Sequence, residues 1–207
     1  MSLSTGQRVL DACTGAAVAV IGHGNPDVQA AVMEQMSRLW YTHTVAFTTP
    51  IAEALADTLL EGNPYGLSRA FFVCSGSEAV DSALKLARQY YVEIDQPQRR
   101  HIVGRQRSYH GILHVARRAP FKDALILDNV SYVNPTYAYC GQRADETEDT
   151  YAARLVQELD DKFQDICPNN VIAFISEPVG GAMDGSSRPP GDTTGECAGG
   201  VTSRASC

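Results

Sequence analysis

The stretch FFVCSGSEAV, from Phe71 to Val80, decides how this chain is expected to fold. Its apolar first half favours a buried strand over residues 69–74, and Ser75-Gly76-Ser77 is typical of a tight turn. Apolar side chains then recur every three or four residues, which predicts a helix over residues 78–91. A strand that turns directly into a helix is characteristic of α/β folds.

The flanking sequence continues this alternation of helices and strands. Asn25-Pro26 and Thr49-Pro50 are typical helix starts, because Asn and Thr cap a helix and Pro suits its first turn. A further helix is expected from Glu148. The other expected strands are residues 101–103, 125–127 and 171–175. We therefore predict an α/β fold, a mostly parallel sheet with helices on both faces, whose functional residues follow the carboxyl ends of the strands.

The turn Ser75-Gly76-Ser77 is a candidate phosphate-binding site. Backbone N–H groups at a helix start attract anions, the helix dipole adds to this attraction, and Gly76 allows an anion to approach closely. The turn is neither a Walker A loop nor a G-x-G-x-x-G dinucleotide fingerprint. The alternative is that Ser77 only caps the helix, with Glu78 favouring its dipole.

Two further loops follow expected strands and carry candidate ligand-binding side chains. Tyr109, beside His110 and Gly111, can lay its ring on a flat aromatic ligand; the alternative is a turn with a hydrogen-bonded histidine. Glu177 can orient a cationic or hydrogen-bonding group, although a lone acid at such a place more often caps a turn or is solvated. Each signal is weak alone, whereas their order and spacing are specific.

Taken in succession, five stretches resemble the class III pyridoxal-phosphate-dependent aminotransferases of fold type I. They are residues 10–32, 48–50, 71–88, 109–111 and 173–182. The resemblance implies a pyridoxal 5′-phosphate (PLP) cofactor, transfer of an amino group from an amine or amino acid to a keto acid, and a homodimer. It also implies that residues 1–47 are a segment of the family's small domain and linker, and that residues 48–186 are part of its large, PLP-binding domain.

The resemblance carries roles over to individual residues. The cofactor-binding residues that it implies are Ser75, Gly76, Ser77, Tyr109, His110 and Glu177. The Ser-Gly-Ser turn would hold the cofactor phosphate, Tyr109 would stack on the pyridine ring with His110 beside it, and Glu177 would order the ring's surroundings. Trp40 and Tyr41 would line the substrate pocket at a subunit interface.

The chain departs from the family after Pro189-Pro190-Gly191. The family continues with an Asp that pairs with the pyridine nitrogen and a Lys that forms a Schiff base with the cofactor. The three lysines of this chain, Lys85, Lys122 and Lys162, do not occupy such a position. We therefore expect a truncated, N-terminal portion without catalytic residues, inactive by itself, with a disordered tail over residues 187–207.

Two other hypotheses stay open at this point. The chain can be a non-catalytic fragment that binds PLP or phosphate weakly or associates with a full-length paralogue. It can also be an unrelated nucleotide- or phosphosugar-binding domain that shares only the turn between strand and helix. The second of these predicts nucleotide binding without any response to PLP.

The composition of the 207 residues, 44% hydrophobic and 20% charged, is typical of a globular protein. The net charge of −7 gives no electrostatic reason to bind nucleic acid or an anionic membrane, and no apolar run is long enough to span a bilayer. The six cysteines form no C-x-x-C pair, so we expect no metal site and reduced, mostly buried thiols. The N-terminus lacks the features of a signal peptide, which predicts a cytoplasmic location.

Overall fold

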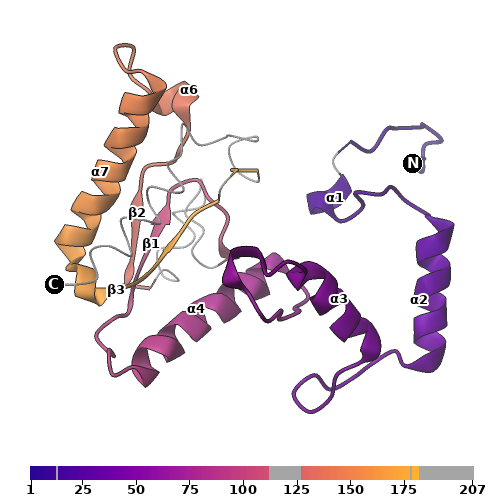
Figure 1. The fold of residues 1–207 in the computed structure, drawn as a ribbon. Coiled ribbons are helices and arrows are strands. Elements are labelled where there is room, and N and C mark those ends of the chain that lie inside the picture. Colours follow the sequence, from indigo (N-terminus) through magenta and orange to yellow (C-terminus); the bar gives the residue numbers. More distant parts are fainter. Residues whose placement is uncertain (13, 112–126, 178, 182–207) are drawn as a thin grey trace. The chain divides into compact units, whose positions relative to one another are not determined.

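The computed structural model describes residues 1–12, 14–111, 127–177 and 179–181 of the chain. It divides into two compact units, Met1–Phe71 and Phe72–Cys207 (Figure 1). The domain boundaries expected after residues 47 and 186 stay predictions. The expected tail, residues 187–207, and residues 125 and 126 of one expected strand lie outside the described residues.

The unit Met1–Phe71 is mainly helical. Its elements are α1 (Thr14–Ala17), α2 (Pro26–Arg38), α3 (Pro50–Leu60) and the short 3-10 helix η1 (Pro64–Gly66). The side chain of Asn25 accepts the N–H groups of Asp27 and Val28, and the Thr49 hydroxyl accepts the N–H of Ala52. These caps confirm the two helix starts that the sequence predicts.

The helices α2 and α3 bury none of their residues. Each carries an apolar stripe at helical spacing, and the side chains of these stripes are exposed. They are Val28, Val32 and Met36 on α2, and Ile51, Leu55 and Leu59 on α3. Such a stripe is the face that a helix ordinarily turns towards a core, and the described part of Met1–Phe71 has no buried core to cover it.

The unit Phe72–Cys207 contains the predicted parallel sheet. Strands β1 (His101–Arg105), β2 (Val130–Val133) and β3 (Val171–Ile175) lie in the order β2-β1-β3. The central strand β1 pairs in parallel with both neighbours. β2 was not predicted, because its four residues are too few to show a period.

Helices lie on both faces of this sheet, which confirms the predicted fold class. Helices α4 (Gly76–Glu93), α6 (Ala138–Gly141) and α7 (Glu148–Ile166) and the 3-10 helix η3 (Pro168–Asn170) complete the unit. On one face, Leu84 and Tyr91 of α4 pack against Ile102. On the other face, Leu159 of α7 packs with Val103, the next residue of the same strand. Neighbouring residues of a strand point to opposite faces, so both faces of β1 are covered.

The strand predicted over residues 69–74 is not formed, and this prediction was wrong. No backbone–backbone hydrogen bond joins these residues to another described segment, and Phe71 is 76% exposed. A strand exists only through hydrogen bonds to a neighbour, so an apolar run is insufficient by itself. The described thiols, those of Cys74, Cys140 and Cys167, are exposed, where mostly buried thiols were expected.

Candidate functional site

The start of α4 is organised by two reciprocal hydrogen bonds. The Ser75 hydroxyl accepts the N–H of Glu78 at 3.2 Å, and the Glu78 carboxylate accepts the N–H of Cys74 at 2.8 Å. Ser75 is therefore the N-cap, and the alternative that Ser77 caps the helix was wrong. The helix begins two residues earlier than predicted, because the cap is the first serine of the turn.

The N–H groups of Gly76 and Ser77 occupy the first two positions of this helix. No described residue accepts a hydrogen bond from either of them. A Cβ atom placed on Gly76 would meet nothing within 4 Å, so the space beside it is open. Because α4 is 18 residues long, its dipole contributes positive potential at this end. This arrangement can bind an anion through backbone N–H groups.

The loop that contains Tyr109 lies directly against the start of α4. A Cβ atom on Gly111 would lie 3.6 Å from both Cα and Cβ of Ser77, which is ordinary van der Waals contact. Gly111 also has a φ of +60°, a conformation that favours glycine. The structure thus brings together two motifs that are separated along the chain.

Within this loop, Tyr109 and His110 have different surroundings. His110 is buried, at 7% exposure, whereas Tyr109 is 51% exposed. An exposed aromatic ring beside an anion-binding helix start can cover a flat ligand that carries a negative group.

Glu177 fastens the same loop to the end of β3. One oxygen of its carboxylate, Oε1, accepts the N–H of Tyr109 at 2.7 Å, and the other, Oε2, accepts the N–H of Gly181 at 3.2 Å. Both oxygens are therefore engaged with backbone donors. Glu177 orders the loop around Tyr109 through these two contacts.

Arg105, at the end of β1, was not recognised from the sequence. It is only 5% exposed, and its Nε donates to the Ser176 hydroxyl at 3.2 Å while Nη1 donates to the Asn134 carbonyl at 3.0 Å. Its guanidinium also lies 5.4 Å from the ring centroid of Phe174. Arg105 thereby ties together the carboxyl ends of the three strands. The available signal was a charged residue that ends an apolar strand, because such a charge is seldom buried without partners.

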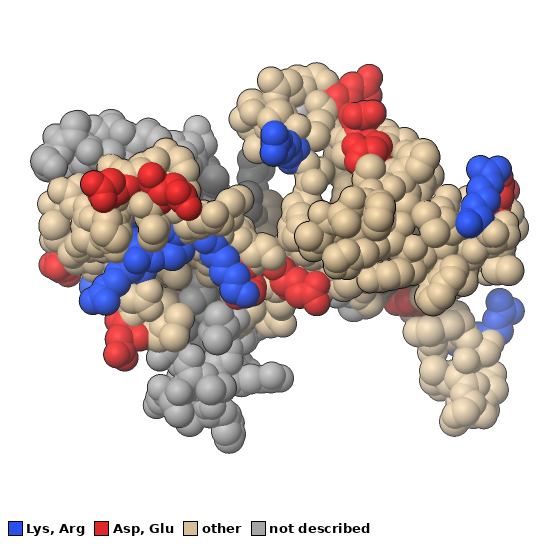
Figure 2. Space-filling model, turned by 90° about the horizontal axis from the view of Figure 1, so that it is seen from below, with Lys and Arg blue, Asp and Glu red and all other residues tan. Residues whose placement is uncertain are grey.

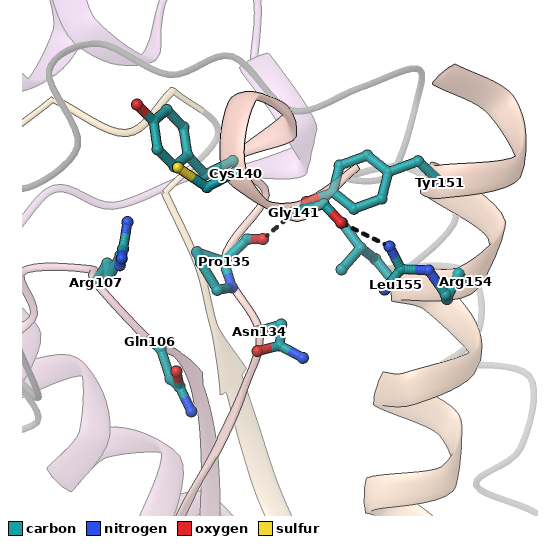
Figure 3. A pocket seen from close by; sticks show the side chains of 10 residues that line it. Gln106, Arg107, Asn134, Pro135, Cys140, Gly141, Tyr151, Arg154 and Leu155 are labelled. Carbon is teal, nitrogen blue, oxygen red and sulfur yellow. Dashed lines mark hydrogen bonds between the residues drawn. The ribbon is translucent and has the colours of Figure 1, made fainter. Parts of the chain in front are cut away.

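A cavity of about 270 Å³ lies beside the ends of β1 and β2. Figure 3 shows its lining, which is Gln106, Arg107, Asn134, Pro135, Tyr137, Cys140, Gly141, Tyr151, Arg154 and Leu155. Arg154 donates to both carboxylate oxygens of Glu146, at 2.5 and 2.9 Å, and to the Gly141 carbonyl at 2.8 Å. The hydrogen bonds from Arg154 and from the Arg143 backbone lower the pKa of Glu146 to about 2. No sequence motif indicated this cavity.

The described lysines lie away from the candidate site. Lys85 lies on an exposed face of α4, where its Nζ is 2.6 Å from Asp81, and Lys162 of α7 lies 3.5 Å from Asp165. Neither residue follows a strand. Lys122 lies outside the described residues.

Trp40 and Tyr41 are exposed in the other unit, with ring centroids 6.3 Å apart, and their expected place in a substrate pocket stays a prediction. The described residues contain no group of His, Cys, Asp and Glu that could hold a metal ion. Among the described helices, none has the length and apolar character needed to cross a membrane.

The sequence matches the family model of the class III aminotransferases over residues 1–191. It is 39% identical over 194 residues to an uncharacterized aminotransferase of Schizosaccharomyces pombe, a match that covers 90% of this chain and 42% of the relative. It is 36% identical over 197 residues to an aminotransferase of Gibberella zeae, covering 90% of this chain and 39% of the relative.

The fold is similar to solved transaminase structures. One, described as a transaminase with L-Ala, has a TM-score of 0.90 and 28% sequence identity, covering 98% of this chain and 49% of the other. Another, a PLP-bound aminotransferase mutant from Vibrio fluvialis, has a TM-score of 0.89 and 25% identity, covering 98% of this chain and 46% of the other. The chain spans 42% and 39% of the length of the two curated relatives.

Proposed function

Because this chain belongs to the class III aminotransferase family, we propose that it serves in PLP-dependent transfer of an amino group from an amine or amino acid to a keto acid. The two curated relatives are both aminotransferases, and this chain covers 42% and 39% of their lengths. Membership of this family excludes an unrelated nucleotide-binding domain. The activity of the whole protein, its substrates and its partners are parts of the proposal.

The start of α4 fits the phosphate group of PLP. Its two N–H groups and its dipole suit a dianionic phosphate, and the open space at Gly76 admits the phosphate oxygens. The hydroxyl of Ser77 can add a donor. Ser75, which is engaged as the N-cap, positions the turn by fixing the first turn of the helix.

The loop around Tyr109 fits the ring of the cofactor. Its contact with Ser77 through Gly111 is the observation that carries the proposal, because it brings the loop that bears the exposed Tyr109 against the anion-binding helix start. Glu177 holds that loop in place through the Tyr109 N–H. His110, the next residue of the loop, is proposed to lie beside the ring. When bound, PLP supplies an electron sink for the electron pair left on the substrate carbon.

We propose further that this chain, by itself, binds the cofactor without turnover. Lys85 and Lys162 are on helices and paired with acids, so neither is placed to bond to a cofactor held by the start of α4 and the Tyr109 loop. The same observation favours the second candidate function, a fragment that binds PLP or phosphate and associates with a full-length paralogue.

We propose a homodimer for the intact protein, with Trp40 and Tyr41 in the substrate pocket. The exposed apolar stripes of α2 and α3 support an assembly, since such stripes are ordinarily covered. The net charge of −7 supports the absence of a nucleic-acid partner. The free thiols of Cys74, Cys140 and Cys167 support a reducing, cytoplasmic compartment.

Calorimetric titration with PLP and with inorganic phosphate tests the proposal. Gly76→Val should abolish binding of both ligands, because its side chain fills the open space beside the N–H groups. Tyr109→Ala should weaken the binding of PLP by about 1 kcal/mol and leave the affinity for inorganic phosphate unchanged. Ala83→Val, an exposed position of the same helix, is the matched control. Wild-type PLP affinity in Gly76→Val contradicts the assignment of the site.

The proposed lack of turnover has its own measurement. Borohydride treatment of the chain with PLP, followed by peptide mass spectrometry, should show no specific attachment at Lys85, Lys122 or Lys162, and a transaminase assay should show no product. Attachment at one of these lysines together with turnover would show that the chain supplies its own catalytic lysine.

A further inference from the structure

A second cavity, of about 430 Å³, lies at the end of the sheet where the strands begin. Its lining is Arg88, Pro97, Gln98, Arg100, His101, Ile166 and Asn170. Arg100 and His101 lie at the start of β1, and Asn170 directly precedes β3. Tyr109 and Glu177 follow the other ends of these strands, so this cavity is separate from the candidate cofactor site.

The lining of this cavity contains two guanidinium groups and no carboxylate. Figure 2 views the molecule from the end at which the strands begin, and on its left Lys and Arg side chains gather in a band bordered by acidic ones. The chain as a whole has a net charge of −7, so a cavity whose lining contains arginines and no acidic residue differs from the overall charge of the chain.

The two arginines of the cavity differ in how they are held. Arg88 is anchored, because its Nη1 donates to the carbonyls of Pro97 and Arg99 at 2.7 Å each. The Arg100 guanidinium makes no hydrogen bond or ion pair with any described residue. By contrast the neighbouring Arg99 is buried and donates to Gln96, to Asn169 and to two backbone carbonyls. The cavity thus has one preorganised guanidinium and one with its donors available.

His101 reports the potential inside the cavity. Its burial lowers the pKa of the imidazole, and the positive charges of Arg100 and Lys162 lower it further. The ring Nε2 lies 2.9 Å from the Ser131 hydroxyl, so the histidine is held in place. Lys162 also lies 3.5 Å from Asp165, which offsets part of its charge. Burial disfavours a charge of either sign, whereas the contribution of Arg100 and Lys162 reflects a positive potential at the imidazole, which favours an anion nearby.

We propose that this cavity binds a small polyanion, a metabolite with two or more neighbouring phosphate or carboxylate groups. Two guanidinium groups can each donate parallel hydrogen bonds to such oxygens, and the Gln98 amide adds a neutral donor. A volume of about 430 Å³ is in the range of small-molecule sites. Anion binding here would join α4, β1 and the segment before β3, three parts of the unit that are distant along the chain.

Nuclear magnetic resonance of the full chain, labelled with nitrogen-15, tests this proposal at constant ionic strength. Pyrophosphate is the probe for a phosphate ligand, and citrate is the probe for a carboxylate ligand. Amide signals of Gln98, Arg100 and His101 should shift and saturate, while those of Gly76 and Ser77 report separately on the candidate cofactor site. Tighter binding of pyrophosphate assigns a phosphate ligand, and tighter binding of citrate assigns a carboxylate ligand.

Arg100→Gln should lower the affinity for the more tightly bound probe about tenfold. This is the effect expected from losing a charged hydrogen-bonding partner. Arg143→Gln removes the same charge from an exposed residue that follows α6, at the other end of the sheet, and should leave the affinity unchanged. Equal weakening by both variants, or shifts that grow linearly without saturation, would overturn the proposal. Unchanged thermal midpoints of both variants show that the fold is intact.

Discussion

Glu177 holds the backbone of Tyr109 across 68 positions of sequence, through a hydrogen bond of 2.7 Å from the Tyr109 N–H to its Oε1. The same carboxylate holds Gly181 with its other oxygen. A carboxylate is the side chain that can accept from two backbone donors with both oxygens, since an amide has only one acceptor oxygen. The position of Tyr109 therefore depends on Glu177, which acts through the backbone of the loop.

Glu177→Gln should weaken PLP binding by about 1 to 3 kcal/mol, because an NH₂ group would face one of the two backbone donors. Affinity for inorganic phosphate should stay close to that of the wild type, because the start of α4 is unchanged. Calorimetric titration of both ligands measures the difference. Glu93→Gln, at the far end of α4, is the control for loss of one negative charge. Equal weakening of phosphate and PLP would indicate a general loss of structure.

Gly141→Ala should destabilise the unit Phe72–Cys207. A Cβ atom at this position would overlap the hydroxyl of Tyr151, which itself donates to the Pro135 carbonyl at 3.3 Å. Forced repacking of this kind costs about 1 to 3 kcal/mol. Urea denaturation measures the change, with Gly181→Ala as the control because a Cβ there meets nothing within 4 Å.

The double variant Gly141→Ala/Tyr151→Phe extends this prediction. Removal of the hydroxyl takes away the atom that the new methyl group would meet first, so part of the lost stability should return. Additive losses in the double variant would show that the hydroxyl is not the source of the strain.

The ion pair between Glu146 and Arg154 should make stability depend on pH. The pKa of Glu146 is lowered from 4.5 to about 2 in the folded protein, so the folded state favours the charged form. The resulting stabilisation is present above pH 5 and is lost as the pH falls from about 5 to 2. Urea midpoints of wild type and Glu146→Gln should differ at pH 7 and converge near pH 2. A difference that persists at pH 2 would assign the effect to packing.

Arg105→Met should destabilise the protein more than the same change at an exposed arginine. The substitution leaves the Asn134 carbonyl and the Ser176 hydroxyl without the donors that now reach them. The expected loss is about 2 kcal/mol or more. Thermal unfolding measures it, with Arg143→Met as the exposed control. Equal losses in both variants would contradict the role of Arg105 in joining the strand ends.

Helix starts were accessible from the sequence because a cap is made within a few residues. Asn25 and Thr49 cap their helices as expected, and α7 begins at the predicted Glu148 behind the cap Thr147. The strand Val171–Ile175 was also predicted, since its unbroken apolar run is typical of a strand covered on both faces. The order of the motifs along the chain was enough to indicate the family.

Contacts between distant segments needed the tertiary structure. The strand expected over residues 69–74 lacks a partner among the described residues, whereas β2 exists because its few residues meet β1. The local sequence pattern indicates that a segment tends to be extended. It does not indicate which neighbouring strand the segment pairs with.

The sequence by itself determined the caps, the alternation of helices and strands, and the family's motifs, because each depends on residues adjacent in the chain. Only the tertiary structure decided that Gly111 rests on Ser77, that Glu177 holds Tyr109 and that Arg105 ties the strand ends. Parallel strands made this possible, since they bring loops far apart in sequence to one edge of a sheet. Those contacts depend on the packing of the whole unit, which no short stretch of sequence specifies.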